Sequence, residues 1–403
     1  MTDLRCVLAS AATVAALAGP AAAEAGRGSL SEAITAGKPI LEVRVRYEGV
    51  DQANLAETAS AFTARTRLGW ESGAWNGLKG LVEFEDVRQL GAEDYNSTLN
   101  GKTAYPVIAD PEVTELNRLQ LTWTPNSAFS GTLGRQRIAL DDQRFVGAVG
   151  WRQDEQTFDA VRADVSVGKL KATAAWLGNI NRVFGEGADW DSDSWIVNAA
   201  YAGPDAFKPT AFVYALDFDN AKANSSITWG VRATGKAKVG AMALAYAASY
   251  ARQSDYASNP ADFDLDYWMV EGAATYGIAT LKANFESLEG NGTKGFATPL
   301  ATLHAFQGWA DVFLATPANG IEDASLALAL APRITALPKL QFMVVAHSFQ
   351  AQRGGADLGD EIDVQVATPL TKRLSGVIKY ADYDGVPGFP SRQKIWIGVD
   401  FKL

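Results

Sequence analysis

Arginine is the residue type whose spacing in this chain points most directly to chemistry. Arginines recur at alternate positions, as in Arg44 and Arg46, and again in Arg65 and Arg67. Residues two apart on a strand share one face, so each pair would place two guanidinium groups side by side. A guanidinium stays charged at any relevant pH and grips carboxylates through two parallel hydrogen bonds. These rows predict a surface that selects anionic solutes, or one that pairs with acidic neighbours.

Side chains suited to catalysis are scarce. The chain has only two histidines, His304 and His347, and its one cysteine is Cys6. Asp311 follows His304, but neither histidine has an apparent serine nucleophile in a triad order. We therefore expect no enzyme and no cofactor, with polar-lining or interface roles for both histidines.

Ligand sites of recognisable spacing are also missing from the sequence. We find no phosphate-binding loop and no metal-ligand motif. The acidic residues 141–142 and 189–193 are interpreted as solvated turns rather than cation sites. The net charge of −10 excludes nucleic acid as a partner, because phosphate binding needs a basic face.

The composition excludes a helical membrane protein. Hydrophobic residues make up 47% of the 403 residues, and the mean hydropathy is −0.06. No stretch after the N-terminal segment supplies the roughly 18 consecutive apolar residues of a spanning helix. The chain is nevertheless rich in glycine and aromatic residues, as barrels with tight turns and aromatic girdles are.

The N-terminus has the three parts of an export signal. Arg5 supplies positive charge, residues 7–18 are mostly apolar, and residues 21–23 are three alanines that suit cleavage near Ala23. The apolar core is too short to anchor the protein in a membrane. We expect residues 1–23 to be a signal peptide and residues 24–39 to be a periplasmic lead.

Residues 40–403 alternate between apolar and polar side chains in segments of about 10 residues. Long polar stretches interrupt them at 91–111, 182–193, 253–264 and 290–299, whereas Gly168 and Gly277 mark very short turns. Short turns at one end and long loops at the other are typical of outer-membrane barrels. We predict an all-β transmembrane barrel of about 18 antiparallel strands. Residues 303–314 and 326–330 are its weakest candidate strands.

The end of the chain supports this prediction. Ile395, Ile397, Val399, Phe401 and Leu403 form one apolar face that reaches the last residue, where soluble proteins usually fray. A soluble propeller or sandwich would show the same alternation. However, its strands would be shorter, and it would not explain aromatic residues near the strand ends.

An apolar face toward lipid turns the polar face toward the channel. This reading places the following arginines along the lumen: Arg44, Arg46, Arg65, Arg67, Arg118, Arg135, Arg137, Arg162 and Arg232. A barrel of this size encloses water rather than a packed core. Such a lining lowers the barrier for an anionic solute, although wide pores also carry arginine rows that pair with acids.

Two motif blocks resemble the alginate-export porin family. The first comprises residues 134–138, 142–147 and 150–162, and the second begins at 304–311 and continues to Asp323. The resemblance implies a monomeric barrel of 18 strands whose arginine-lined lumen passes anionic polysaccharide. From the first block it carries over five lumen or constriction residues: Arg135, Arg137, Arg144, Arg152 and Arg162. For Trp151 and Trp309 we expect an interface or packing role.

The chain departs from a dedicated exporter because it shows no long insert that would form a gating plug. Residues 91–111 or 290–299 are the candidates for a partial constriction. We therefore expect a passive porin in the outer membrane for acidic, uronate-type saccharides such as alginate or for small organic anions. A general porin, and a structural or adhesive barrel without a pore, remain alternatives. Outer-membrane lipid and the barrel-assembly machinery are the other expected partners.

Overall fold

The structure is a computed structural model that describes residues 28–403 except Pro338. The predicted signal peptide, residues 1–23, lies outside the described residues. A short helix, α2 (Leu30–Thr35), begins at a capping box in which Ser29 and Glu32 exchange side-chain and backbone hydrogen bonds. Trp70 donates its indole N–H to the carbonyl of Ile34 at 3.1 Å, which fixes the helix beside the first strands.

The rest of the described chain forms one sheet of antiparallel strands. Their bounds are β1 Lys38–Gln52, β2 Ala59–Glu71, β3 Leu78–Gln89, β4 Val113–Asn126, β5 Phe129–Gln136, β6 Thr157–Val167, β7 Leu170–Asn181, β8 Trp190–Tyr201, β9 Lys208–Leu216, β10 Ser226–Val239, β11 Met242–Asp255, β12 Asp264–Tyr276, β13 Ala279–Leu288, β14 Ile321–Leu330, β15 Gln341–Gln350, β16 Asp357–Pro369, β17 Leu374–Asp384 and β18 Arg392–Lys402.

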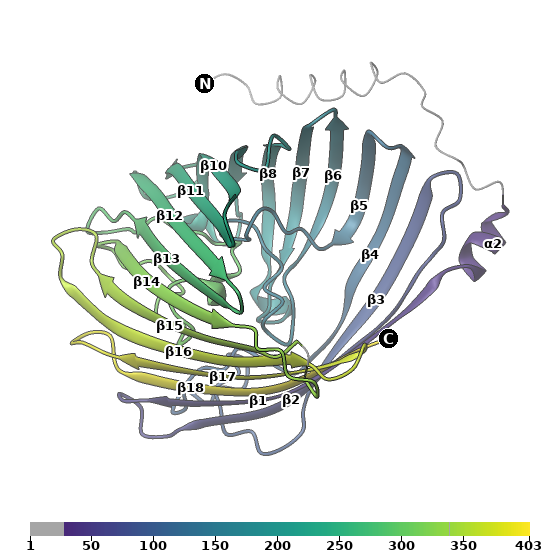
Figure 1. Ribbon diagram of the computed structural model, residues 1–403. Helices are drawn as coiled ribbons and strands as arrows, with labels where there is room; N and C mark the ends of the chain where they lie inside the picture. Colours follow the sequence, from purple (N-terminus) through teal and green to yellow (C-terminus); the bar gives the residue numbers. More distant parts are fainter. Residues whose placement is uncertain (1–27, 338) are drawn as a thin grey trace.

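The sheet closes on itself. Each strand pairs with its sequence neighbours, and β1 pairs with both β2 and β18, so the ring of 18 strands in the described residues has no free edge. Figure 1 shows this closed ring. Because the sheet is closed, every strand has a hydrogen-bonded neighbour on both sides. The backbone N–H and C=O groups therefore need no water, which the hydrocarbon core of a membrane cannot supply. The predicted barrel and its strand number are confirmed.

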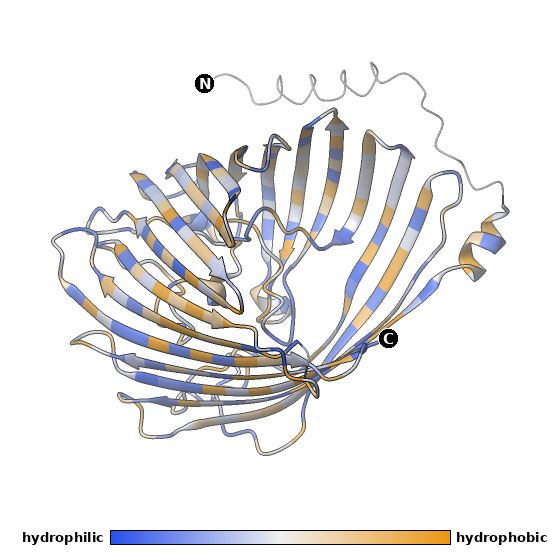
Figure 2. Ribbon diagram, viewed as in Figure 1, coloured by the Kyte–Doolittle hydropathy of each residue, from blue (hydrophilic) through white to orange (hydrophobic). Residues whose placement is uncertain are grey.

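The alternation along the strands sorts side chains to the two faces of the wall. Leu119, Leu121 and Trp123 of β4 are about half exposed on the outside. On β18, Ile395 and Ile397 face outward, whereas Trp396 between them is fully buried inside. Figure 2 shows the resulting bands of hydrophobic and hydrophilic residues along the strands. This apolar outer face suits contact with lipid.

The described part of the chain holds no helix with the length and apolar character needed to cross a membrane.

The two ends of the barrel differ. At the end where β1 begins and β18 ends, strands join through tight turns, in which Gly168, Gly240 and Gly277 adopt positive φ angles of 58°, 59° and 60°. At the other end lie the long connections 90–112, 137–156 and 289–320. By the outer-membrane pattern, the turn end is periplasmic and the long-loop end extracellular.

Two expectations about the strands and their connections need correction, and one weak candidate is confirmed. Residues 303–314 are not a strand but part of the 289–320 connection, which includes the short helix η3 (Leu303–Ala305). Residues 326–330 do belong to a strand, β14. The strand β8 begins at Trp190, inside the stretch 182–193 that we expected to be a loop, because Trp190, Ser192 and Ser194 already alternate with outward residues.

The outer face can be tested by placing one charge on either side of the wall. Leu121→Arg should destabilise the inserted barrel by about 2–4 kcal/mol, because arginine near the membrane midplane faces lipid. The matched change Gln120→Arg, on the inner face of the same strand, should have a much smaller effect. Equilibrium folding into lipid vesicles, monitored by heat-modifiable gel mobility, measures both. Equal effects would contradict the assignment of the faces.

Candidate solute pathway

Two of the described connections cross the interior of the barrel. We name residues 137–156 inner loop 1 and residues 289–320 inner loop 2. Inner loop 1 leaves the wall between β5 and β6, yet its Arg144 donates to Glu286 of β13 on the far side at 2.6 Å, and its Trp151 carbonyl accepts from Arg46 of β1. Residues 290–299, one of the two candidates for a partial constriction, do belong to inner loop 2, whereas the sequence analysis did not anticipate inner loop 1.

The two inner loops are joined to each other by backbone hydrogen bonds. Val146 and Leu300 form a parallel bridge, in which the N–H of Gly147 donates to the carbonyl of Leu300 at 2.8 Å. The N–H of Thr302 donates to the carbonyl of Gln143 at 3.0 Å. These bonds satisfy backbone groups that would otherwise be unpaired in the interior.

Aromatic side chains anchor the joined loops to one side of the wall. Phe145 packs against Phe212 of β9 and Tyr267 of β12 with ring centroids 4.9 Å and 5.3 Å apart, and it also touches Phe296 of inner loop 2. These residues belong to a large buried apolar cluster. The lumen therefore contains a packed core, contrary to the expectation of a simple water-filled channel.

The opposite side of inner loop 1 is held by polar contacts with β1 and β2. Arg44 donates to the carbonyls of residues 150–152, and Gln153 donates its side-chain amide to the hydroxyl of Thr63 at 2.8 Å. Arg152 pairs with Glu48 at 3.1 Å. On this side of the barrel, the side chain of Arg44 donates hydrogen bonds to inner loop 1 and does not simply face an open channel.

The tip of inner loop 2 docks on acidic residues of β16. The N–H groups of Trp309 and Ala310 donate to Asp363 at 3.2 Å and to Glu361 at 2.7 Å. The approach depends on Gly308, which has a φ of +80° and whose Cβ, if present, would lie only 2.3 Å from Glu361.

His304 lies at the centre of a buried cluster beside this tip. Its ring stacks on Trp151 with centroids 4.5 Å apart and planes 1° from parallel. Its Nδ1–H donates to Asp311 at 2.8 Å, and its Nε2 accepts from the Lys379 ammonium at 2.7 Å. Burial lowers the pKa of His304 to about 3, opposed by Asp311 and reinforced by Lys379. This neutral histidine joins the two inner loops, and Trp151 has a packing role there.

All eleven arginines predicted for the lumen are in ion pairs. Five of them are buried: Arg46 with Asp110, Arg65 and Arg67 with Glu85, Arg144 with Glu286, and Arg152 with Glu48. The other six keep some solvent contact: Arg44 with Asp400, Arg118 with Glu83, Arg135 with Asp159, Arg137 with Glu155, Arg162 with Asp164, and Arg232 with Asp142. The structure thus joins each arginine to an acid.

Not all of these arginines lie on strands. Arg137, expected on a strand, comes one residue after β5, and it begins inner loop 1, which also carries Arg144 and Arg152. Arg135 lies at the end of β5, where it donates to the carbonyl of Leu116 at 3.1 Å. The β4–β5 ladder stops at Leu119 and Arg135, so this side chain satisfies a carbonyl beyond the last strand pair.

Cavities remain around the inner loops, and they differ in charge. A cavity of about 650 Å³ lies among inner loop 2, the β7–β8 connection and the β9–β10 connection. We name it the basic cavity, because Arg144, Arg182 and Lys294 line it and no acidic residue does so among the described residues. A smaller cavity of about 170 Å³ lies against β12–β15 and is lined by Asp142, Glu271, Glu286 and Asp323, with Lys282 and His347. Gln307 lines both cavities, so it lies in the partition between them.

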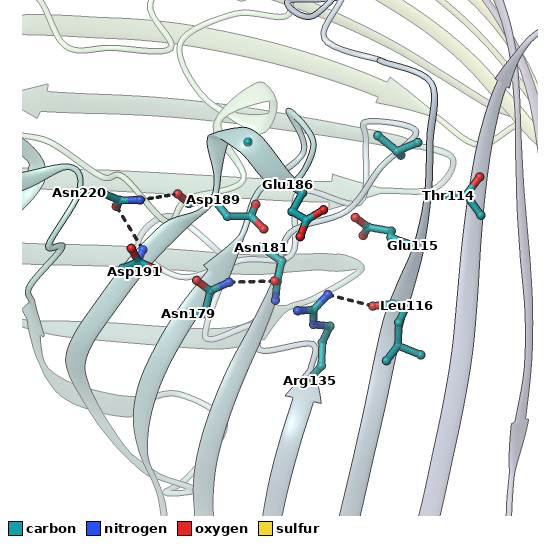
Figure 3. A pocket seen from close by; sticks show the side chains of 12 residues that line it. Thr114, Glu115, Leu116, Arg135, Asn179, Asn181, Glu186, Asp189, Asp191 and Asn220 are labelled. Atoms are coloured by element: carbon teal, nitrogen blue, oxygen red, sulfur yellow. Dashed lines mark hydrogen bonds between the residues drawn. The ribbon is translucent and has the colours of Figure 1, made fainter.

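A third hollow, of about 680 Å³, lies beside the end of β5, and its charged lining residues are mostly acidic (Figure 3). Its side chains include Glu115, Arg135, Glu186, Asp189 and Asp191. We name it the acidic hollow. It has the opposite character to the basic cavity, although both lie toward the long-loop end of the barrel.

Arg182 and Lys294 were missed by the sequence analysis. Neither has an ion-pair partner within the described chain. Arg182 lies 4.0 Å from the ring centroid of Trp190, and Lys294 lies 4.2 Å from that of Phe263. Burial lowers the pKa of both side chains. They sit in polar connections without strand periodicity, so alternation could not identify them.

Inner loops 1 and 2 form the partition between the basic cavity and the smaller cavity, and Arg144 helps to hold them in place. Arg144→Met leaves the buried Glu286 without its cationic partner, which should cost about 3–5 kcal/mol and loosen both inner loops. Single-channel conductance should rise and become noisier. The control Arg162→Met breaks a solvent-accessible pair with Asp164 on the same strand, which is held by neither loop, and should cost only about 1 kcal/mol. Unchanged conductance in Arg144→Met would contradict a partition made by these loops.

The buried histidine predicts a sensitivity to acid. Between about pH 6.5 and pH 3 the unfolded chain binds a proton at His304 that the folded protein does not, so stability falls as the pH falls. The loss should reach about 2–3 kcal/mol near pH 4.5. Denaturant titrations at pH 7 and pH 4.5 should therefore differ more for the wild type than for His304→Gln. The same difference in both proteins would show that His304 is not the group responsible.

Known proteins with the same architecture come from bacterial outer membranes. The described chain aligns with Acinetobacter baumannii OccAB4 at 12% identity, covering 91% of this chain and 98% of that one, with a TM-score of 0.74. It also aligns with Pseudomonas aeruginosa OpdK, solved with vanillate, at 14% identity, 92% and 99% coverage and a TM-score of 0.72. At such identities the likeness shows the fold alone. No curated protein matches the chain.

The sequence itself matches a family. Residues 40–282 match the Alginate export family, a range that includes the first motif block and ends before the second. The family, the closed barrel and its apolar outer face together make the protein a porin of the bacterial outer membrane. The chain belongs to the Alginate export family.

Proposed function

We propose that this porin gives passive diffusion to small acidic solutes, either uronate-type saccharides or organic anions. Solutes would enter through the basic cavity and pass the partition at Gln307. The arginines that keep solvent contact, such as Arg44, Arg118 and Arg232, would line the route beyond the cavity. Residues 1–23 would direct the chain to the membrane as a cleaved signal peptide.

The basic cavity is the observation that carries the proposal. Each predicted lumen arginine is matched by a carboxylate, so the arginine row by itself presents little net positive charge. Arg182 and Lys294 are different, since they face a cavity without acids and have no ion-pair partner among the described residues. Cations that line a narrow route lower the barrier for anions and raise it for cations.

The other lining residues suit a small organic anion or a sugar. Thr293, Thr298, Asn224 and Gln307 offer hydrogen-bond donors and acceptors, and Trp190 offers an aromatic face. A volume of about 650 Å³ lies within the range of small-molecule sites, roughly 300–1,000 Å³. Because the inner loops are bonded to each other and to the wall, a long polysaccharide would have to displace them. The geometry therefore favours monomers and short oligomers over a polymer.

One structural neighbour supports a carboxylate solute. OpdK was solved with vanillate, an aromatic carboxylate. At 14% identity the likeness shows the fold alone. The comparison is therefore an analogy for the class of solute and points to no single compound.

Alternatives to this proposal predict different behaviour. A non-specific porin would conduct without a preference for anions, and a structural barrel would not conduct. Catalysis receives no support from the histidines: His304 is held between Asp311 and Lys379, and His347 donates to Asp323 at 2.9 Å, within a buried acidic group. We propose that neither acts on a substrate.

Reversal potentials in a salt gradient test the proposal. The wild-type protein in a planar bilayer should prefer anions, and Arg182→Ala/Lys294→Ala should lose at least half of that preference. The control Lys169→Ala/Lys372→Ala removes the same charge from exposed turns at the other end and should change little. Blocking by uronate oligomers should weaken in the first variant alone.

Two results would overturn the proposal. A cation preference in the wild type would mean that the acidic hollow and the loop acids control entry. Absence of conductance in every variant, including Arg144→Met, would leave a barrel without a pore.

A further inference from the structure

Three carboxylates from separate parts of the chain meet beside the acidic hollow. Glu85 lies on β3, Glu115 on β4 and Asp154 on inner loop 1, and one oxygen of each lies within 4.8 Å of the others. Glu85 and Glu115 stand directly opposite in the β3–β4 register. Like charges in that position destabilise a sheet, and inner loop 1 adds a third.

Asp154 is the anomaly in this group. It is fully buried, and neither of its carboxylate oxygens has a hydrogen-bond partner in the described structure. The residues on either side of it do form hydrogen bonds: the N–H of Gln153 donates to Asp110 at 2.9 Å, and Glu155 accepts from Asn117 at 2.8 Å, although the Oε1 atom of Gln153 also lacks a partner. A buried carboxylate with neither oxygen partnered is costly, so Asp154 points to a missing ligand.

The nearby cations do not neutralise the group. Arg67 donates to Glu85 and lies 3.1 Å from Glu155, so it already serves two carboxylates. Arg65 lies 3.9 Å from Glu85. Neither Glu115 nor Asp154 forms an ion pair within the described residues. Two negative charges are therefore left over, which one divalent cation would balance.

We propose that Glu85, Glu115 and Asp154 bind a divalent cation, Ca²⁺ in preference to Mg²⁺. Carboxylate oxygens are hard ligands, and Ca²⁺ takes them at about 2.3–2.6 Å in flexible geometry. Two ligands of one ion then lie at most about 5 Å apart, which agrees with the spacing of this group. Figure 3 shows Glu115 directed into the acidic hollow, where water can complete the coordination. Mg²⁺ demands a stricter octahedron than three converging side chains provide.

The site would have a mechanical effect. Asp154 belongs to inner loop 1, whereas Glu85 and Glu115 belong to the wall, so the ion would clamp the loop to β3 and β4. The other contacts of this segment reach β1 through Arg44, β2 through Gln153, and β4 through the single hydrogen bond from Asn117 to Glu155. Calcium would thus set how firmly one side of the constriction is held. This inference does not depend on which solute passes.

The experiment uses full-length mature protein refolded into detergent without lipopolysaccharide, which itself binds Ca²⁺. Terbium luminescence and calorimetry with Ca²⁺ measure binding, and thermal unfolding is compared in Ca²⁺ and in EDTA. The wild type should bind one Ca²⁺ and unfold at a higher temperature with it. Asp154→Asn should weaken binding at least tenfold and remove the temperature difference. The control Glu186→Gln removes a carboxylate from the same hollow but outside the group, and should behave as the wild type.

Specific results would overturn the site. If the wild type fails to bind at millimolar Ca²⁺, and Asp154→Asn is more stable in both buffers, the carboxyl groups share a proton instead. If Glu186→Gln and Asp154→Asn lose the same Ca²⁺ affinity, the ion responds to the overall negative charge of the acidic hollow and not to a specific site. If Asp154→Asn does not fold, Glu115→Gln repeats the test from the half-buried side of the group. Full binding by Glu115→Gln would then place the ion elsewhere.

Discussion

The requirement that every backbone group in the wall finds a partner without water governs this molecule. It is met because β1 pairs with both β2 and β18, so the sheet has no edge. Closure with 18 strands in turn sets a circumference too wide for wall side chains to fill. The interior is filled instead by inner loops 1 and 2, whose own backbone groups then need partners. The wall arginines, the β16 carboxylates and the bridge between the loops provide these partners.

The same requirement explains why the interior charges occur in pairs. A buried ion pair contributes little net stability, but removing one member leaves a costly unpaired charge. Arg46, Arg144 and Arg152 therefore act mainly as specific connectors that hold each loop in one position. Charge left unpaired within the described structure stands out against this background. It is positive at Arg182 and Lys294 in the basic cavity and negative at Asp154 beside the acidic hollow.

The sequence predicted the wall much better than the interior. Alternation of period two is a local property, so it revealed the strands, the outer residues such as Leu121 and the approximate strand number. Arg144 and Arg152 were singled out only through the resemblance to the family, and their partners Glu286 and Glu48 lie far away in the sequence. Inner loop 2 was divided in the prediction between a polar loop and a weak strand, because residues 303–314 are apolar for a reason other than lipid contact: they pack inside.

The residues on which the proposals rest could not be identified from sequence patterns. Arg182, Lys294 and Asp154 belong to connections, where neither period nor propensity constrains side-chain direction. Asp154 can bind a cation only together with Glu85 and Glu115. These three residues meet only because of the β3–β4 register and the path of inner loop 1. Such a juxtaposition is a property of the closed barrel rather than of any segment.

The docking of inner loop 2 also bears on how the barrel is made. Trp309, Ala310 and Asp311 contact Asp363, Glu361 and Lys394, which lie on β16 and β18, near the end of the chain. This tip of the loop cannot dock until these strands are in place. The tip of the loop thus depends on the strands that are made last, as the closure between β1 and β18 also does. The constriction is therefore complete only in the closed barrel.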